Sequence, residues 1–70
     1  MNGWKNHSTW NVSLWIQNEE PLYELAKRCQ CYEELVIALG EMEIYETPDG
    51  VSYKADDLDT HALNEMMGNL

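Results

Sequence analysis

The sequence predicts a mainly α-helical protein, a small single domain of three or four short helices. Three observations support this prediction: apolar residues at helical spacing, polar residues placed to cap the helices, and one strong turn sequence. The chain has 70 residues, enough for one domain over residues 1–70. A domain of this size buries only about 60% of the surface of its unfolded chain, so we expect marginal stability and no enclosed substrate cavity.

The first apolar segment, residues 10–18, is compatible with two structures. Apolar residues alternate with polar ones, as in a strand, at Trp10, Val12, Leu14 and Ile16. Trp15 breaks this alternation, and in a helix the same residues would cover most of the circumference. Because the next segment is plainly helical, we favour a helix, with Ser8 or Thr9 as its N-cap.

Two further helices follow from regular stripes. The first stripe has i, i+3, i+4, i+7 spacing and consists of Leu22, Leu25, Ala26 and Cys29. Asn18 is its expected cap, Pro21 fits its first turn, and Lys27 and Arg28 complement its negative end. The second stripe consists of Tyr32, Leu35, Val36, Leu39 and Met42. Gly40 costs this helix about 1 kcal/mol and either ends it or permits a close contact.

The clearest turn is Thr47-Pro48-Asp49-Gly50, where we expect Gly50 to adopt a positive φ. The segments beside it, within residues 44–53, form either a short β-hairpin or an ordered loop. A last helix follows, with Asp56, Asp57 and Asp59 as candidate caps. Its stripe consists of Leu58, Ala62, Leu63, Met66 and Met67. From all the stripes we expect a core that includes Trp10, Leu14, Leu22, Leu25, Leu35, Leu39 and Leu63.

Charge is distributed unevenly along the chain. Thirteen acidic residues oppose four basic ones, giving a net charge of -9, and residues 31–70 contain ten acids and a single lysine. This balance disfavours direct binding of nucleic acid or of an anionic membrane. No apolar run is long enough to span a membrane, and the N-terminus lacks the apolar stretch of a signal peptide. We therefore expect a cytoplasmic protein with reduced cysteines.

No catalytic, cofactor or metal site is predicted. Cys29, Cys31, His7 and His61 have suitable atoms for zinc, but their spacing does not match a structural site. Neither histidine lies in a recognisable nucleophile motif, and no glycine-rich phosphate loop occurs. We expect a protein that binds a partner and is not an enzyme.

The acidic residues of the C-terminal half have two interpretations. They form either a solvated face or an anionic patch that docks on a basic protein surface, and the candidate residues are Glu33, Glu34, Glu41, Asp56, Asp57 and Asp59. Trp4 either covers the core or is a contact hot spot. A homodimer through the Trp-rich N-terminal half is the alternative arrangement.

A distinctive motif, G-W-x-N-x-x-T-W-N-V-x-L-W-I, covers residues 3–16. Leu22-Tyr23, residues 47–51 and Leu63-Asn64-Glu65-Met66 extend the match. In these residues the sequence resembles an uncharacterised family of short proteins from phages, cyanobacteria and mobile elements. The resemblance implies no activity and no site residues, but it implies a phage or mobile-element setting. If a phage encodes the protein, the expected location is the cytoplasm of the host cell. Small acidic proteins of that setting often resemble anti-CRISPR and anti-restriction proteins. We therefore expect an inhibitor that binds a basic surface of a host defence or nucleic-acid-handling complex.

Overall fold

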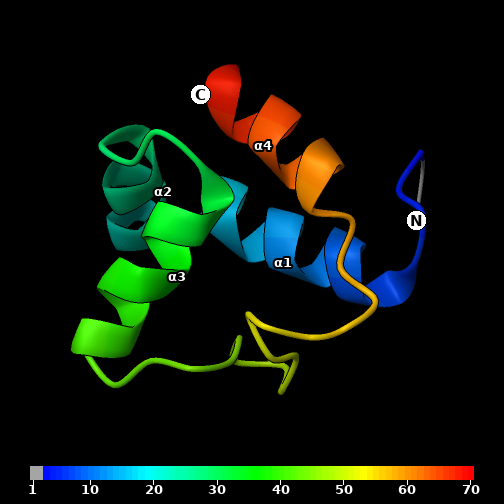
Figure 1. Cartoon of the computed structure of the whole chain (residues 1–70), viewed down its shortest axis with the longest axis horizontal. Helices are drawn as coiled ribbons and strands as arrows, with labels where there is room; N and C mark the ends of the chain where they lie inside the picture. Colours follow the sequence, from blue (N-terminus) through cyan, green and yellow to red (C-terminus); the bar gives the residue numbers. More distant parts are fainter. Residues whose placement is uncertain (1–2) are drawn as a thin grey trace.

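The computed structural model describes residues 3–70, so the first two residues of the predicted domain lie outside it. Its four helices are α1 (His7–Asn18), α2 (Glu20–Lys27), α3 (Tyr32–Glu41) and α4 (Thr60–Gly68). In Figure 1, α1 lies at the centre, with α2 and α3 on one side of the molecule and α4 above it. Helix α1 contacts α2 and α4, and α3 contacts the same two helices. The predicted mainly α-helical class and small single domain are confirmed.

The ambiguous segment is a helix, but its N-cap differs from the prediction. Asn6 caps α1, its Oδ1 accepting a hydrogen bond from the Thr9 N–H at 2.8 Å. The predicted caps have other partners. The Thr9 hydroxyl accepts from the Asp59 N–H at 2.9 Å, and the Ser8 hydroxyl donates to the Asp57 carboxylate at 3.0 Å. These two side chains therefore join the start of α1 to the segment before α4.

Helices α1 and α2 are separated by a single residue, Glu19. Its N–H donates to the Trp15 carbonyl at 3.0 Å, and its side chain accepts from the Leu22 N–H at 3.0 Å. The predicted cap, Asn18, is wrong because its side chain turns back and donates to a carbonyl of α1. Pro21 explains the break, since it lacks an N–H and its ring would clash with the preceding turn of a continuous helix.

Helix α3 ends in a Schellman motif whose left-handed residue is not glycine. The Ile44 N–H donates to the Leu39 carbonyl and the Glu43 N–H to the Gly40 carbonyl, both at 2.9 Å. Glu43 has a φ of 62°, a conformation that is unfavourable for a residue with a Cβ. Neither role predicted for Gly40 is found, because the helix continues past it and a Cβ there would lie 3.9 Å from the nearest atom, on Tyr45.

The segment between α3 and α4 is an ordered loop and not a developed hairpin. A single antiparallel bridge joins Glu46 and Ser52. The predicted turn is present, because the Gly50 N–H donates to the Thr47 carbonyl at 2.8 Å and Gly50 has a φ of 87°. Of the three candidate caps of the last helix, Asp59 has this role and accepts from the N–H three residues later.

The core forms where the four helices and this loop meet. Its buried apolar residues are Val12, Ile16, Leu22, Ala26, Tyr32, Leu35, Leu39, Tyr53, Leu63 and Met67. Trp10, Leu14 and Leu25, which were predicted to be buried, are only half-buried. Helix α1 instead turns inward Val12 and Ile16 together with the small polar residues Thr9, Asn11 and Ser13. Trp10 lies outside this face and packs against the His7 ring, with centroids 5.5 Å apart.

Candidate interaction site

Side-chain hydrogen bonds link the turn at residues 47–51 to α1. The Thr47 hydroxyl donates to Asn11 Oδ1 at 2.7 Å and accepts from the Val51 N–H at 3.1 Å. Asn11 Nδ2 and Trp15 Nε1 both donate to Asp49 Oδ2 at 2.8 Å. We call the set Asn11, Trp15, Thr47 and Asp49 the polar anchor.

The polar anchor explains why polar and aromatic residues interrupt the apolar pattern of α1. The hydrogen bond from Asn11, and then that from Trp15, lower the pKa of Asp49 below its usual range. Asp49 is therefore a structural acceptor and not a proton donor at neutral pH. Sequence reasoning did not identify Asn11 or Asp49 as a pair. The only signals were an amide within an apolar run and an acid within a turn.

A second set of hydrogen bonds joins α3 to the loop and to α4. The buried Tyr32 hydroxyl donates to the Tyr53 carbonyl of the loop at 2.7 Å, and the Tyr32 N–H donates to the Asn64 side chain of α4 at 2.7 Å. Burial raises the pKa of Tyr32 far above the ordinary tyrosine value, with a smaller contribution from Tyr53. The hydroxyl therefore stays protonated and keeps its donor role.

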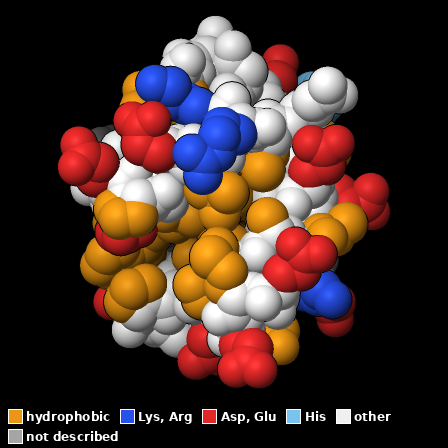
Figure 2. Space-filling model, turned by 90° about the vertical axis from the view of Figure 1, so that its left-hand side faces the viewer, with side chains coloured by type: hydrophobic (Ala, Val, Ile, Leu, Met, Phe, Trp, Pro, Cys, Tyr) orange, Lys and Arg blue, Asp and Glu red, His pale blue; other side chains and the backbone are white. Residues whose placement is uncertain are grey.

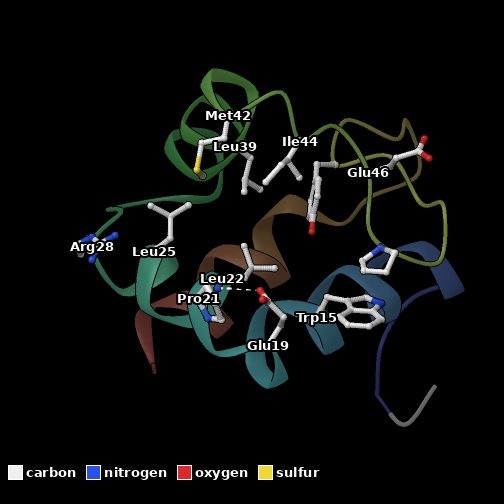
Figure 3. Close-up of a pocket in the computed structure, with 12 residues that line it drawn as sticks. Trp15, Glu19, Pro21, Leu22, Leu25, Arg28, Leu39, Met42, Ile44 and Glu46 are labelled. Atoms are coloured by element: carbon white, nitrogen blue, oxygen red, sulfur yellow. Dashed lines mark hydrogen bonds between the residues drawn. The ribbon is translucent and has the colours of Figure 1, made fainter.

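These two sets of hydrogen bonds hold the loop in place, and the loop forms part of the wall of a groove. The groove has a volume of about 580 Å³ and lies between α1 and α2 on one side and the end of α3 with its following loop on the other (Figure 3). It is lined by Trp15, Glu19, Pro21, Leu22, Leu25, Arg28, Leu39, Met42, Ile44, Glu46, Pro48 and Tyr53. Nine of these twelve residues are apolar or aromatic. We call it the apolar groove.

Large apolar side chains remain exposed at the rim of the apolar groove. Met42 is 53% exposed and Ile44 is 40% exposed, although Met42 was predicted to lie on the inward stripe of α3. Figure 2 shows an apolar surface on this side of the molecule, with acidic side chains around it and basic ones above it. This exposure could not be predicted from the sequence, because apolar residues next to a helix end are also compatible with a core.

A second hollow, of about 650 Å³, has a mixed lining. Glu33 and Ile37 of α3 lie there near Lys54, with Cys31 at the start of the helix. Cys31 and Cys29 are half-buried free thiols. Burial, and then the nearby Glu34, raise the pKa of Cys29, which makes this thiol less reactive. Among residues 3–70, no three His, Cys, Asp or Glu side chains lie close enough to hold a metal ion.

Three of the six acids predicted as a patch have hydrogen bonds within the fold. Glu34 accepts from the Gln30 N–H at 2.8 Å, Asp57 accepts from Ser8, and Asp59 caps α4. The other three are exposed and have no hydrogen bond or ion pair to another side chain within the described chain. They are Glu33, Glu41 and Asp56.

Few of the acidic side chains face an internal cation. In the described part of the chain, Glu24 lies 3.9 Å from Lys27, and Glu65 lies 3.7 Å from His61, which is charged only if protonated. Both pairs are exposed, so they contribute little to stability. Trp4, the remaining predicted contact residue, is half-buried and packs against the core.

The fold and these surfaces define a small α-helical protein with an apolar groove and an acidic surface that internal cations leave largely uncompensated. In the part of the chain that the structure describes, no helix is both long and apolar enough to cross a membrane. The chain belongs to a family of unknown function (DUF7249), whose model matches residues 1–70. No match was found among curated proteins or among solved structures.

Proposed function

We propose that the protein is a non-catalytic inhibitor, of phage or mobile-element type, that binds a basic surface of a host defence or nucleic-acid-handling complex. The observation that supports this proposal is the uncompensated charge. The net charge is -9, and the described residues contain only one ion pair between an acid and a lysine or arginine.

The size of the molecule decides which of these charges act together. Its extents are 28 × 25 × 19 Å, whereas the screening length is about 8 Å at physiological ionic strength, so only neighbouring acids interact strongly. Neighbouring acids therefore repel one another, which opposes folding, and a basic partner would relieve that repulsion. Such a field also steers a basic partner and raises its association rate.

The test begins with capture of partners from a host lysate by the immobilised full-length chain, followed by mass spectrometry. Association with the purified partner is then measured by surface plasmon resonance from low to high salt. We expect the association rate to fall steeply with salt, while dissociation changes less.

Three of the candidate acids have no side-chain hydrogen bond within the described chain, so replacing them removes charge without breaking a hydrogen bond. The triple substitution Glu33→Gln, Glu41→Gln and Asp56→Asn should slow association about tenfold, while circular dichroism shows that the fold is retained. A matched control removes the same charge from α2 and α4, by Glu20→Gln, Glu24→Gln and Glu65→Gln, and should have a smaller effect. The proposal would be contradicted if the association rate neither falls with salt nor changes in the first triple variant.

The second candidate function is a homodimeric structural or regulatory module that uses the Trp-rich N-terminal half. Its support is that Trp10 and Leu14 are half-buried on α1 and leave apolar surface at that face. Sedimentation velocity over a range of concentrations distinguishes the two functions. A dimer that persists in high salt and is lost in Trp10→Ser would favour the second.

A further inference from the structure

We propose that the apolar groove is a docking site for an amphipathic helix of a partner protein, with the C-terminal end of that helix at Arg28 and its N-terminal end at Glu46. This contact is apolar, so the inference goes beyond the acidic-surface proposal and does not depend on it.

The lining of the groove indicates an apolar occupant. Leu22 and Leu39 form part of its wall while belonging to the core, and Met42 and Ile44 add exposed apolar surface at its rim. Concave sites lined mainly by apolar side chains are a common form of binding site. Met42 is well suited to such a site, because its unbranched side chain adapts to different partners.

The few polar groups of the groove indicate that the occupant is helical. The backbone N–H groups of Leu22 and Tyr53 are engaged already, because they donate to the Glu19 carboxylate and the Tyr45 carbonyl. An extended peptide would bring its own backbone N–H and C=O groups against apolar side chains and leave them unpaired. A helix satisfies these groups internally and presents apolar residues at i, i+3, i+4 and i+7.

The charges at the two ends fit the dipole of a helix. Figure 3 shows Arg28 and Glu46 at opposite ends of the groove. A helix carries about half a positive charge at its N-terminus and half a negative charge at its C-terminus. Its C-terminus therefore belongs at Arg28 and its N-terminus at Glu46.

The net charge argues against a second copy of the chain as the occupant. Two copies would each bring a charge of -9 into contact, and Figure 2 shows acidic side chains around the exposed apolar surface. A partner helix with basic residues on its polar face would instead be attracted.

The backbone at the rim explains how Ile44 comes to line the groove. Glu43 adopts a left-handed conformation, which is unfavourable for a residue with a Cβ. The Schellman motif that contains it places Ile44 next to Leu39, so that both line the groove.

The probe is a labelled, amidated peptide of about 14 residues, which is about 21 Å long as a helix and fits the 25 Å extent of the molecule. It carries leucines at i, i+3, i+4 and i+7, lysines elsewhere, and one glutamate in its last turn. The control peptide has the same composition with the leucines scrambled. Fluorescence anisotropy with the full chain at high salt should show at least tenfold tighter binding of the striped peptide.

Variants of exposed residues locate the contact without unfolding the protein. Met42→Glu and Ile44→Glu should each weaken binding of the striped peptide at least tenfold. Ile37→Glu is the matched control, because Ile37 is 59% exposed on α3 and does not line the groove. It should bind as the wild type does. Circular dichroism confirms that all three variants are folded.

Orientation is tested at Arg28. Arg28→Glu should weaken the peptide with glutamate in its last turn and strengthen a peptide with lysine there. Three results would overturn the inference: equal affinity for striped and scrambled peptides, equal losses in Ile37→Glu and Ile44→Glu, or a concentration-dependent dimer that Met42→Glu abolishes. Failure of the acidic-surface proposal would appear separately, as a salt-independent association rate with the captured partner.

Discussion

Replacing Thr47 by valine tests whether the polar anchor holds the loop onto α1. The substitution keeps the shape of the side chain and removes one hydroxyl, which is buried with only 3% of Thr47 exposed. That hydroxyl donates to Asn11 Oδ1 and accepts from the Val51 N–H, so both groups lose a partner. Asn11 is 2% exposed and has no access to water as a replacement.

The expected cost follows from these two groups. A buried polar group without a partner costs about 1–3 kcal/mol, and the half-buried Val51 N–H lies at the lower end of that range. The free energy of unfolding should therefore fall by about 2–4 kcal/mol. For a domain of this size each kcal/mol lowers the melting temperature by about 4–8 °C, so the total should exceed about 8 °C.

Urea denaturation followed by circular dichroism measures this change. Thr47→Ser is the control, because it keeps the hydroxyl and removes only a methyl group. If Thr47→Val and Thr47→Ser are equally stable within about 0.5 kcal/mol, the hydroxyl does not support the loop and the reasoning is refuted.

Three further predictions concern single sites. Glu43→Gly should raise the free energy of unfolding by about 0.5–1 kcal/mol in urea titrations, because glycine adopts the left-handed conformation freely, whereas Glu43→Ala should not. The lowered pKa of Asp49 means that its contribution to stability is present above the ordinary aspartate pKa and is lost as pH falls through the folded value. Acid titration of the melting temperature should therefore be shallower in Asp49→Asn, and identical curves would contradict this assignment. Leu39→Ala should cost about 2–5 kcal/mol in chemical denaturation, and Leu25→Ala less, because Leu39 is buried and Leu25 is half-buried.

The inward face of α1 shows where sequence reasoning reached its limit. Trp10 and Leu14 are large and apolar, yet they are less buried than the small polar residues Thr9 and Ser13. The buried Thr9 hydroxyl accepts a hydrogen bond from the Asp59 N–H, fifty residues later in the chain. Hydrophobicity along the sequence contains no information about such a partner, so the predicted face of this helix was partly wrong.

The groove was missed for a related reason. The stripe of α3 was predicted correctly at Leu35 and Leu39, and it was extended by periodicity to Met42. The helix ends before Met42, and the left-handed Glu43 redirects the chain, so that Met42 and Ile44 stand at an exposed rim. Apolar residues that follow a helix end give the same sequence signal whether they are buried or exposed.

The sequence by itself determined the helices with regular stripes, the turn with its left-handed Gly50 and the excess of negative charge, and it narrowed the cap of the last helix to three aspartates. Each of these depends on interactions between residues within about one helical turn, or on composition alone. Only the tertiary structure decided that Asn11 and Thr47 are buried, that three of the six candidate acids have hydrogen bonds within the fold, and that an apolar groove stays open. The polar partners of Asn11 lie 36 and 38 residues away along the chain, and pairing over such distances is set by how helices and loop pack together.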